Sequence, residues 1–324
     1  MPKNSYKSEF FHSKIMLFGE YSIILGSMGL TIPYAHFNGS LGFINKNRYT
    51  DLDYARRSNV LLREYYEHLL SLEKEGRLPE NFDTVRLGRD LDKGLYFESS
   101  IPEGYGLGSS GALVAALYHS YKTEHAYPRR ASDNSGTLQL KKDLAVLESW
   151  FHGTSSGIDP LICYMKHPLL IGEDQSISAV GIPKYNLTAD DAIFLLNTGK
   201  PGKTAPLVEN FMKKCEDQSF LDLMKKEYIP VNNNCIKYLT GGDLDKFTDY
   251  LRELSLFQAT HFSAMIPASV EMEWIYGIST GKYLLKLCGS GGGGFALGFT
   301  RDFGEVRKLF ADKGMEIIPV YQTK

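Results

Sequence analysis

PEGYGLGSSGALVAAL, residues 102–117, is the segment that says most about the fold of this 324-residue chain. The apolar stretch 94–99 before it predicts a strand, and residues 109–122 predict a helix. Glycines at alternate positions between the two allow positive φ angles and let a ligand approach the backbone closely. They are Gly104, Gly106 and Gly108. A strand, a glycine loop and a helix in this order are typical of a phosphate-binding loop.

Two serines stand where this predicted helix begins. The free N–H groups and the dipole of a helix N-terminus favour a bound phosphate. The hydroxyls of Ser109 and Ser110 add donors for phosphate oxygens, or an oxygen ligand for Mg²⁺. A plain glycine-rich turn with a serine N-cap has the same local pattern. The choice between these two interpretations therefore depends on other segments.

Two such segments favour a phosphate site. ESWFHGTSSGID, residues 148–159, places Glu148 late in a predicted helix and Asp159 after a glycine-containing turn. Beside a phosphate loop, one carboxylate can hold Mg²⁺ while the other takes a proton from an alcohol. KLCGSGGGGFALGF, residues 286–299, has four consecutive glycines between two predicted strands. That run costs conformational entropy, so it predicts a close approach to the backbone; the alternative is a flexible hairpin.

A fourth segment has a misleading pattern. NTGKPGKT, residues 197–204, almost matches the P-loop pattern GxxxxGK[ST]. Asn197 stands where the first glycine belongs, and Pro201 removes a backbone donor from the loop. We therefore expect Lys203 and Thr204 to lie at a helix start, facing a cleft or solvent, and not in a P-loop.

Together the three glycine and carboxylate segments resemble the GHMP small-molecule kinases, and within them the mevalonate kinases most closely. The stretch SKIMLFGEYSIILGSMGL resembles the first family motif, with Ser13 and Tyr21 in place of the usual Gly and His. Residues 102–110 match the phosphate loop, and residues 289–294 match the third motif. Residues 148–159 follow the mevalonate-kinase form of the central motif.

This resemblance implies a fold. It is an α+β, two-domain GHMP kinase-like fold, with an N-terminal ribosomal-protein-like β-α domain and a C-terminal ferredoxin-like domain. We expect the N-terminal ATP-binding domain to span residues 1–188 and the C-terminal domain to span residues 189–324.

The resemblance also implies roles for individual residues. Asp159 and Lys14 would be catalytic, with Lys14 beside the aspartate. Ser110 and Glu148 would hold Mg²⁺. The implied substrate-binding residues are Glu20, Tyr21 and His152. The residues expected to bind ATP are Gly104, Gly106, Leu107, Gly108, Ser109, Ser110, Gly289, Gly291 and Gly292.

The implied reaction transfers phosphate from ATP to mevalonate, giving 5-phosphomevalonate for isoprenoid precursor synthesis. A phosphomevalonate kinase is an alternative, because the GEY and YGLGSSGA stretches are reminiscent of that group. Another GHMP kinase, or a catalytically silent GHMP-like protein that binds ligands, is a further alternative. The retention of Lys14, Glu148 and Asp159 argues against the silent protein.

The amino-acid composition argues against several other classes of protein. The chain is 43% hydrophobic and 23% charged, as in ordinary globular proteins, and its net charge of -2 argues against a nucleic-acid binder. Its four cysteines form no CxxC pair, which argues against structural zinc and suits buried thiols in a reducing compartment. The sequence has no apolar stretch typical of a signal peptide or a membrane span, so we expect a cytoplasmic enzyme. We expect it to act on a small-molecule substrate and to have no nucleic-acid or membrane partner. A homodimer is compatible with the family.

Hydrophobic periodicity predicts the remaining elements. We expect a short apolar strand inside GEYSIILGSMG and a loop over residues 126–140. Further predicted strands are residues 10–18, 30–43, 192–197, 283–287, 295–300 and 316–320. Further predicted helices are residues 54–75, 140–151, 204–226, 243–258, 268–280 and 304–313.

Overall fold

The computed structural model describes residues 9–45, 51–123, 134–153, 155–182, 188 and 190–322. The chain forms two compact units. Unit 1 contains residues 33–101 and 108–167 together with the chain up to Lys14. Unit 2 contains residues 15–32, 102–107 and 168–324. The domain boundary expected at residues 188 and 189 stays a prediction.

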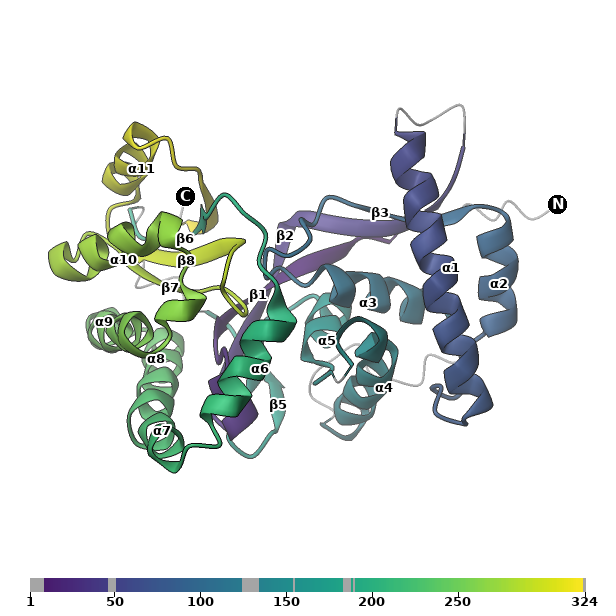
Figure 1. Ribbon diagram of the computed structural model, residues 1–324, viewed down its shortest axis with the longest axis horizontal. Helices are drawn as coiled ribbons and strands as arrows, with labels where there is room; N and C mark the ends of the chain where they lie inside the picture. The colour runs from purple at the N-terminus through teal and green to yellow at the C-terminus, as the bar shows by residue number, and fades with distance from the viewer. Residues whose placement is uncertain are drawn as a thin grey trace. The chain divides into compact units, whose positions relative to one another are not determined.

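The chain contains both helices and strands, in runs of one or several of a kind, as Figure 1 shows. The strands are β1 (Phe11–Phe18), β2 (Gly29–Phe43), β3 (Leu95–Ser99), β4 (Leu169–Ile171), β5 (Ile177–Ala179), β6 (Ala192–Asn197), β7 (Leu284–Leu287), β8 (Phe295–Thr300) and β9 (Ile317–Gln322). The α-helices are α1 (Leu52–Lys74), α2 (Thr84–Asp92), α3 (Ser109–Tyr121), α4 (Asn134–His152), α5 (Ile158–Met165), α6 (Thr204–Lys214), α7 (Gln218–Leu223), α8 (Ile229–Gly241), α9 (Leu244–His261), α10 (Ala268–Thr280) and α11 (Phe303–Asp312). Three short elements are η1 (Ser22–Leu25), η2 (Met224–Tyr228) and η3 (Ser263–Met265).

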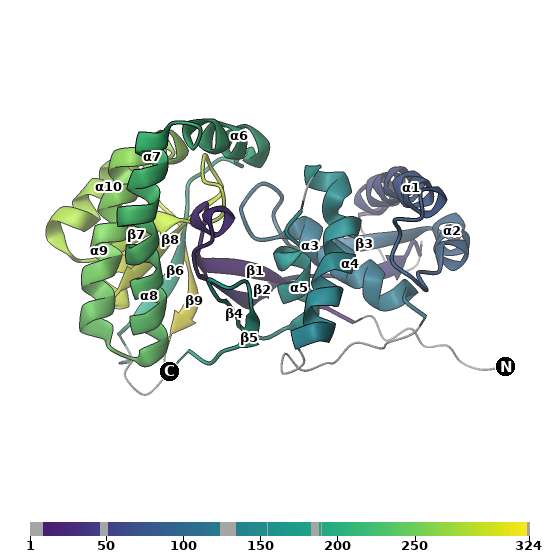
Figure 2. The same cartoon turned by 90° about the horizontal axis from the view of Figure 1, so that it is seen from below.

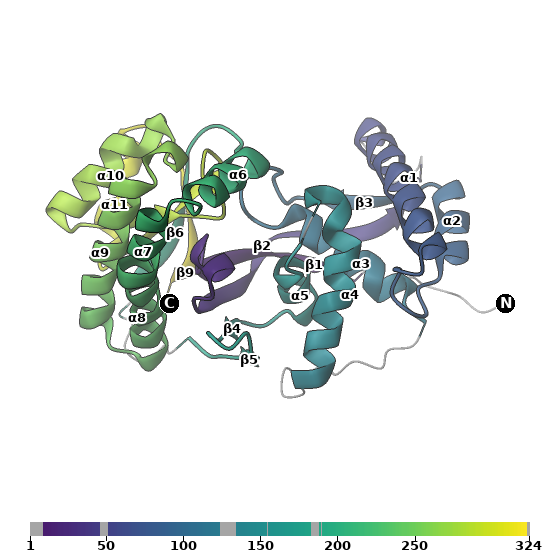
Figure 3. The same cartoon turned by 60° about the horizontal axis from the view of Figure 1, so that its bottom comes forward.

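Unit 1 is built around α3. This helix is apolar on nearly all sides, and it is buried along most of its length, so other elements must surround it. Helices α4 and α5 pack against it and against each other, while α1 packs on β3 and α2 (Figure 3). Strand β3 pairs antiparallel with the end of β2, from Gly39 opposite Ser99 to Phe43 opposite Leu95. This core holds the start of α3, where Ser110 lies.

Unit 2 contains an antiparallel sheet in the order β7-β8-β6-β9. Its inner strands β6 and β8 are almost wholly buried, as their continuous apolar sequences require. Helices α9 and α10 pack on β7, and α8 lies beside α9 (Figure 2). Strands β4 and β5 extend the start of β2 in the same unit. The connection from β7 to β8 is the four-glycine loop.

All but one of the expected strands and most of the expected helices are confirmed. The short strand expected after Phe18 is wrong: the chain forms the 3₁₀ helix η1, between Tyr21 at φ 63° and Gly26 at φ 87°. The single helix expected over 204–226 is also wrong, because α6 ends at Lys214 and Asp217 caps a new helix, α7.

Three helices, α2, α5 and α8, were not predicted. The loop expected over 126–140 is wrong from Asn134 onward, where α4 begins; residues 126–133 lie outside the described residues. All four cysteines are free thiols, and three of them are buried. Within the described part of the chain, no helix has the length and apolar character that crossing a membrane requires.

Candidate active site

An ion pair joins the two residues predicted to be catalytic. Lys14 lies in β1 and Asp159 in the first turn of α5, both in unit 1. Lys14 Nζ is 2.9 Å from Asp159 Oδ2, with side-chain exposures of 6% and 33%. A Cβ at Gly108, the residue before α3, would be 2.7 Å from Lys14 Cγ. Glycine at this position therefore lets the start of α3 lie directly against the lysine.

The second carboxylate, Glu148, is held by two serines. Ser110 Oγ donates to Oε1 over 3.1 Å, and Ser155 Oγ donates to Oε2 over 2.5 Å. The side chain lies near the end of α4 and is buried. Burial, followed by the nearby negative charge of Asp159, raises the pKa of Glu148 to about 7, although the serine hydrogen bonds and Lys14 oppose that shift. The two carboxylates are therefore close enough to interact electrostatically.

This arrangement fits a magnesium ion that is shared with a phosphate ligand. The donors are carboxylate and hydroxyl oxygens, the type that Mg²⁺ prefers, and Mg²⁺ often uses only one or two carboxylates besides phosphates and waters. Among the described residues there is no group of three or more His, Cys, Asp or Glu side chains that could hold a metal. A metal bound together with a nucleotide is compatible with Ser110 and Glu148.

The glycine loops meet in unit 2. A Cβ at Gly106 would be 2.5 Å from the carbonyl oxygen of Cys288, and one at Gly294 would be 2.5 Å from Tyr105 Cα. Both glycines also have φ angles, 77° and 72°, that other residues rarely adopt. The close approach predicted for the four-glycine run thus comes, at these positions, from the backbone of loop 102–107.

Glu20 and Tyr21, predicted to bind substrate, have protein partners in unit 2. Glu20 Oε1 is 2.5 Å from Nζ of Lys286, and both side chains are fully buried. The hydroxyl of Tyr21 donates to the carbonyl oxygen of Ser290 over 2.6 Å. Burial and the charge of Glu20 raise the pKa of Tyr21, which keeps this hydroxyl protonated as a donor. The substrate-binding role of both residues stays a prediction.

The structure thus brings the predicted site residues together in two groups. Lys14, Ser110, Glu148 and Asp159 lie together in unit 1, and the glycines of 102–107 and 289–294 lie together in unit 2. Leu107 is a buried apolar side chain, so only its backbone is available to a nucleotide. The side chain of His152 lies outside the described residues.

Sequence analysis missed the role of Ser155. This serine accepts a hydrogen bond from the N–H of Gly157 and donates one to Glu148. It thereby ties the turn that precedes α5 to the carboxylate at the end of α4. A Ser-x-Gly sequence is compatible with such a turn, but it does not identify a carboxylate partner.

Part of the chain matches a known family model. Residues 71–167 match the family model described as GHMP kinases N terminal domain. Over these residues the chain is similar to the N-terminal domain of GHMP kinases. The matched residues include Ser110, Glu148 and Asp159 but not Lys14, the fourth member of the unit 1 group. A search of the curated protein sequences finds no match.

Solved structures of GHMP kinases share the fold over nearly the whole chain. L. major mevalonate kinase in complex with R-mevalonate matches with a TM-score of 0.63 and 15% identity, over 98% of this chain and 97% of that chain. Lactococcus lactis galactokinase complexed with galactose matches with a TM-score of 0.65 and 14% identity, over 98% and 94%. Streptococcus pneumoniae phosphomevalonate kinase, in complex with phosphomevalonate and AMPPNP, matches with a TM-score of 0.63 and 15% identity, over 97% and 99%. The expected α+β fold of the GHMP kinases is therefore confirmed.

Proposed function

We propose that this protein is an ATP-dependent kinase of a small-molecule alcohol, and that mevalonate is its acceptor. The observation that carries the proposal is the unit 1 group, in which Lys14 pairs with Asp159 while Ser110 and Ser155 hold Glu148. In this group the carboxylate of Asp159 lies beside the ammonium group of Lys14, and the carboxylate of Glu148 accepts a hydrogen bond from the hydroxyl of Ser110, in α3. Phosphoryl transfer to an alcohol needs a proton acceptor and a metal ligand of these kinds.

Each side chain has a distinct part in this reaction. Asp159 accepts the hydroxyl proton of the acceptor as the alcohol oxygen bonds to the γ-phosphorus and the bond to the leaving ADP oxygen breaks. The ammonium group of Lys14 balances the charge of Asp159 and the charge that develops on the transferring group. Ser110 and Glu148 would hold Mg²⁺, which when bound neutralises charge on the β- and γ-phosphates.

The glycine loops position the nucleotide in this proposal. Backbone N–H groups at the start of α3 would donate hydrogen bonds to phosphate oxygens. Mevalonate is the proposed acceptor because the HGTSSGID segment follows the mevalonate-kinase form of the motif. The fold match does not distinguish the acceptor, because mevalonate kinase, phosphomevalonate kinase and galactokinase structures share the fold equally well.

An assay of ADP release tests the function. The purified chain is incubated with Mg²⁺-ATP and, separately, mevalonate, 5-phosphomevalonate, galactose or homoserine. We expect turnover with mevalonate and little with the other three. A clear preference for 5-phosphomevalonate would replace the acceptor but keep the kinase. Activity on galactose alone would reject the isoprenoid assignment, and no ADP release with any acceptor would contradict the kinase itself.

A further inference from the structure

The near-P-loop sequence between β6 and α6 is joined to both glycine loops by its backbone. Gly202 N–H donates to the carbonyl oxygen of Gly104 over 2.8 Å, and Gly294 N–H donates to that of Lys200 over 2.6 Å. Thr198 returns two hydrogen bonds to the carbonyl oxygen of Gly294, from its N–H over 2.9 Å and from its hydroxyl over 2.8 Å. All three loops belong to unit 2. Loop 198–203 is therefore a third member of the glycine-loop group.

The contact is close enough to exclude side chains. A Cβ at Gly202 would be 2.7 Å from the carbonyl oxygen of Gly291, and a Cβ at Gly293 would be 2.6 Å from both Gly202 N and Lys200 O. Atoms at such distances overlap, so neither position tolerates a larger residue without movement of the backbone. Gly202 of the near-P-loop thus serves loop-to-loop packing. A Walker A loop, by contrast, follows a strand of a parallel sheet, whereas β6 pairs antiparallel.

Two lysines of this third loop have no carboxylate partner among the described residues. Lys200 and Lys203 are exposed, and neither forms an ion pair with any residue that the structure describes. They are the basic residues of the three loops, in which Glu103 is the acidic one. Some other lysines of unit 2 have carboxylate partners, as Lys282 has in Glu305 and Lys313 has in Glu273. The two loop lysines therefore leave positive charge beside the glycine loops, where an anion can bind.

We propose that Lys200 and Lys203 form a phosphate-binding site at the edge of the glycine loops. The inference rests on the proposed function, in which those loops hold phosphate groups. A lysine side chain carries its ammonium group on a flexible four-carbon stem. The backbone of Lys200 is bonded to Gly294, and Lys203 follows Gly202 directly, so each stem is long enough to reach a phosphate beside the glycine loops. The ligand is a phosphate ester, either the polyphosphate of the nucleotide or the phosphate of an acceptor that is already phosphorylated.

Binding measurements test the site without requiring turnover. Calorimetry compares the wild-type chain with the Lys200→Ala and Lys203→Ala variants and with the double variant. The probes are Mg²⁺-ATP, inorganic tripolyphosphate, 5-phosphomevalonate and mevalonate. Lys213→Ala is the matched control, because Lys213 is an exposed lysine in the last turn of the same helix, α6.

We expect the double variant to lose about 10- to 100-fold in affinity for a phosphate ligand, since a hydrogen bond to a charged group is worth about 1.5–3 kcal/mol. Loss for ATP and tripolyphosphate assigns the lysines to the nucleotide, and loss for 5-phosphomevalonate alone assigns them to the acceptor. Mevalonate, which has no phosphate, should bind unchanged. A double replacement by arginine should retain the affinity.

Three results would overturn the inference: wild-type affinity of the double variant for all three phosphate probes, no binding of any of them to the wild-type chain, or an equal loss in Lys213→Ala. The proposed function is tested separately by ADP release. If the wild-type chain phosphorylates an acceptor and the lysine variants are indistinguishable from it, the phosphate site fails while the kinase stands. If tripolyphosphate binding depends on the lysines but no acceptor is phosphorylated, the kinase fails while the site stands.

Discussion

At the scale of single residues, the unit 1 group contains the chemistry. Lys14 and Asp159 are far apart in sequence, yet their charged atoms are 2.9 Å apart. Glu148 keeps both carboxylate oxygens in hydrogen bonds to serines, so its position is set before any ligand arrives. Two carboxylates in such different surroundings are suited to different tasks, one as proton acceptor and one as metal ligand.

The Asp159→Asn variant separates chemistry from binding. The amide occupies nearly the same volume but cannot accept a proton from the alcohol, so we expect kcat to fall by about 10²–10⁴-fold. Affinity for ATP, measured by calorimetry, should stay near the wild-type value. Asp92→Asn, at an exposed ion pair with Arg63 in the same unit, is the control and should keep full activity. Turnover of Asp159→Asn within a few-fold of wild type would remove Asp159 from its proposed role.

The Tyr21→Phe variant tests how the glycine loop 289–294 is positioned. It removes the hydroxyl that donates to Ser290 but keeps the ring that packs against Phe211 and Phe262. One hydrogen bond is worth about 0.5–1.5 kcal/mol, so we expect KM for ATP to rise about 2- to 10-fold. KM for the acceptor should change little if the contact with Ser290 is the main role of the hydroxyl.

Tyr283→Phe is the matched control for that experiment. Its hydroxyl also donates to a main-chain carbonyl, that of Glu273, but the contact lies at α10 and not in a glycine loop. Both variants should lose some stability, and only Tyr21→Phe should alter nucleotide kinetics. A rise in acceptor KM alone would instead support direct binding of the acceptor by Tyr21.

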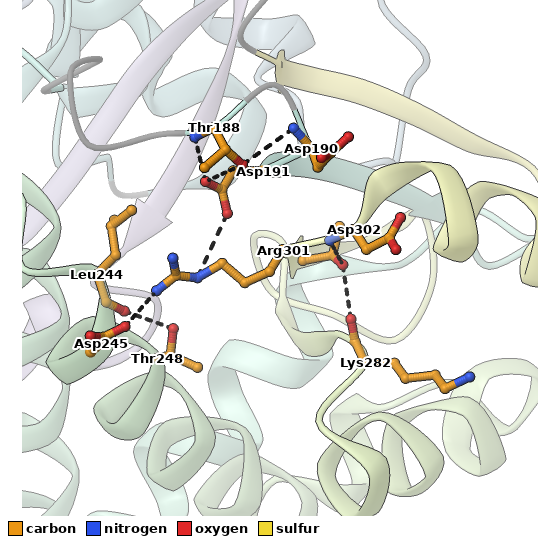
Figure 4. Close-up of polar contacts among 10 residues, drawn as sticks. Thr188, Asp190, Asp191, Leu244, Asp245, Thr248, Lys282, Arg301 and Asp302 are labelled. Carbon is orange, nitrogen blue, oxygen red and sulfur yellow. Dashed lines mark hydrogen bonds and ion pairs between the residues drawn. The ribbon is translucent and has the colours of Figure 1, made fainter.

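At the scale of elements, an ion-pair network links three parts of unit 2. Arg301, directly after β8, lies between Asp191 at the start of β6 and Asp245 at the start of α9, as Figure 4 shows. The two aspartates differ in burial, with side-chain exposures of 4% and 97%. Asp191 also accepts hydrogen bonds from the N–H and hydroxyl of Thr188. The buried aspartate therefore has the greater share in holding these elements.

Asp191→Asn and Asp245→Asn form a matched pair of variants. Asp191→Asn should lower the free energy of unfolding by about 1–3 kcal/mol, because it weakens charge-assisted hydrogen bonds in a buried place. Asp245→Asn should cause no measurable change, because water already solvates that exposed carboxylate. Urea unfolding followed by circular dichroism measures both. Equal effects of the two substitutions on the free energy of unfolding would contradict the larger role of Asp191.

At the scale of the whole molecule, ligand binding should stabilise the chain. A ligand that binds only the folded state stabilises it by about 2.7 kcal/mol at a hundredfold excess over Kd. We therefore expect Mg²⁺-ATP to raise the midpoint of thermal unfolding by a few degrees, and ATP with EDTA to raise it less. In Glu148→Gln this difference between the two conditions should disappear. A wild-type response to Mg²⁺ in that variant would place Glu148 outside the metal site.

The sequence by itself determined the local elements and the sites where glycine is needed. Strand–glycine–helix order predicted the loop before α3, and hydrophobic periodicity predicted α1, α9 and α10, because these signals act over a few neighbouring residues. The same local signals failed between 204 and 241, where one expected helix became several elements, because the break at Asp217 depends on a cap within an otherwise helical pattern.

Only the tertiary structure decided which residues meet. It joined Ser155 to Glu148 and gave the hydroxyl of Tyr21 a main-chain partner in the glycine loop. The Lys14–Asp159 pair was expected only from the family resemblance. It also placed loop 198–203, which the sequence suggested only as a failed P-loop, in backbone contact with both glycine loops. Partners so distant along the chain are brought together by burial and packing of whole elements, and no pattern within a short window contains that information.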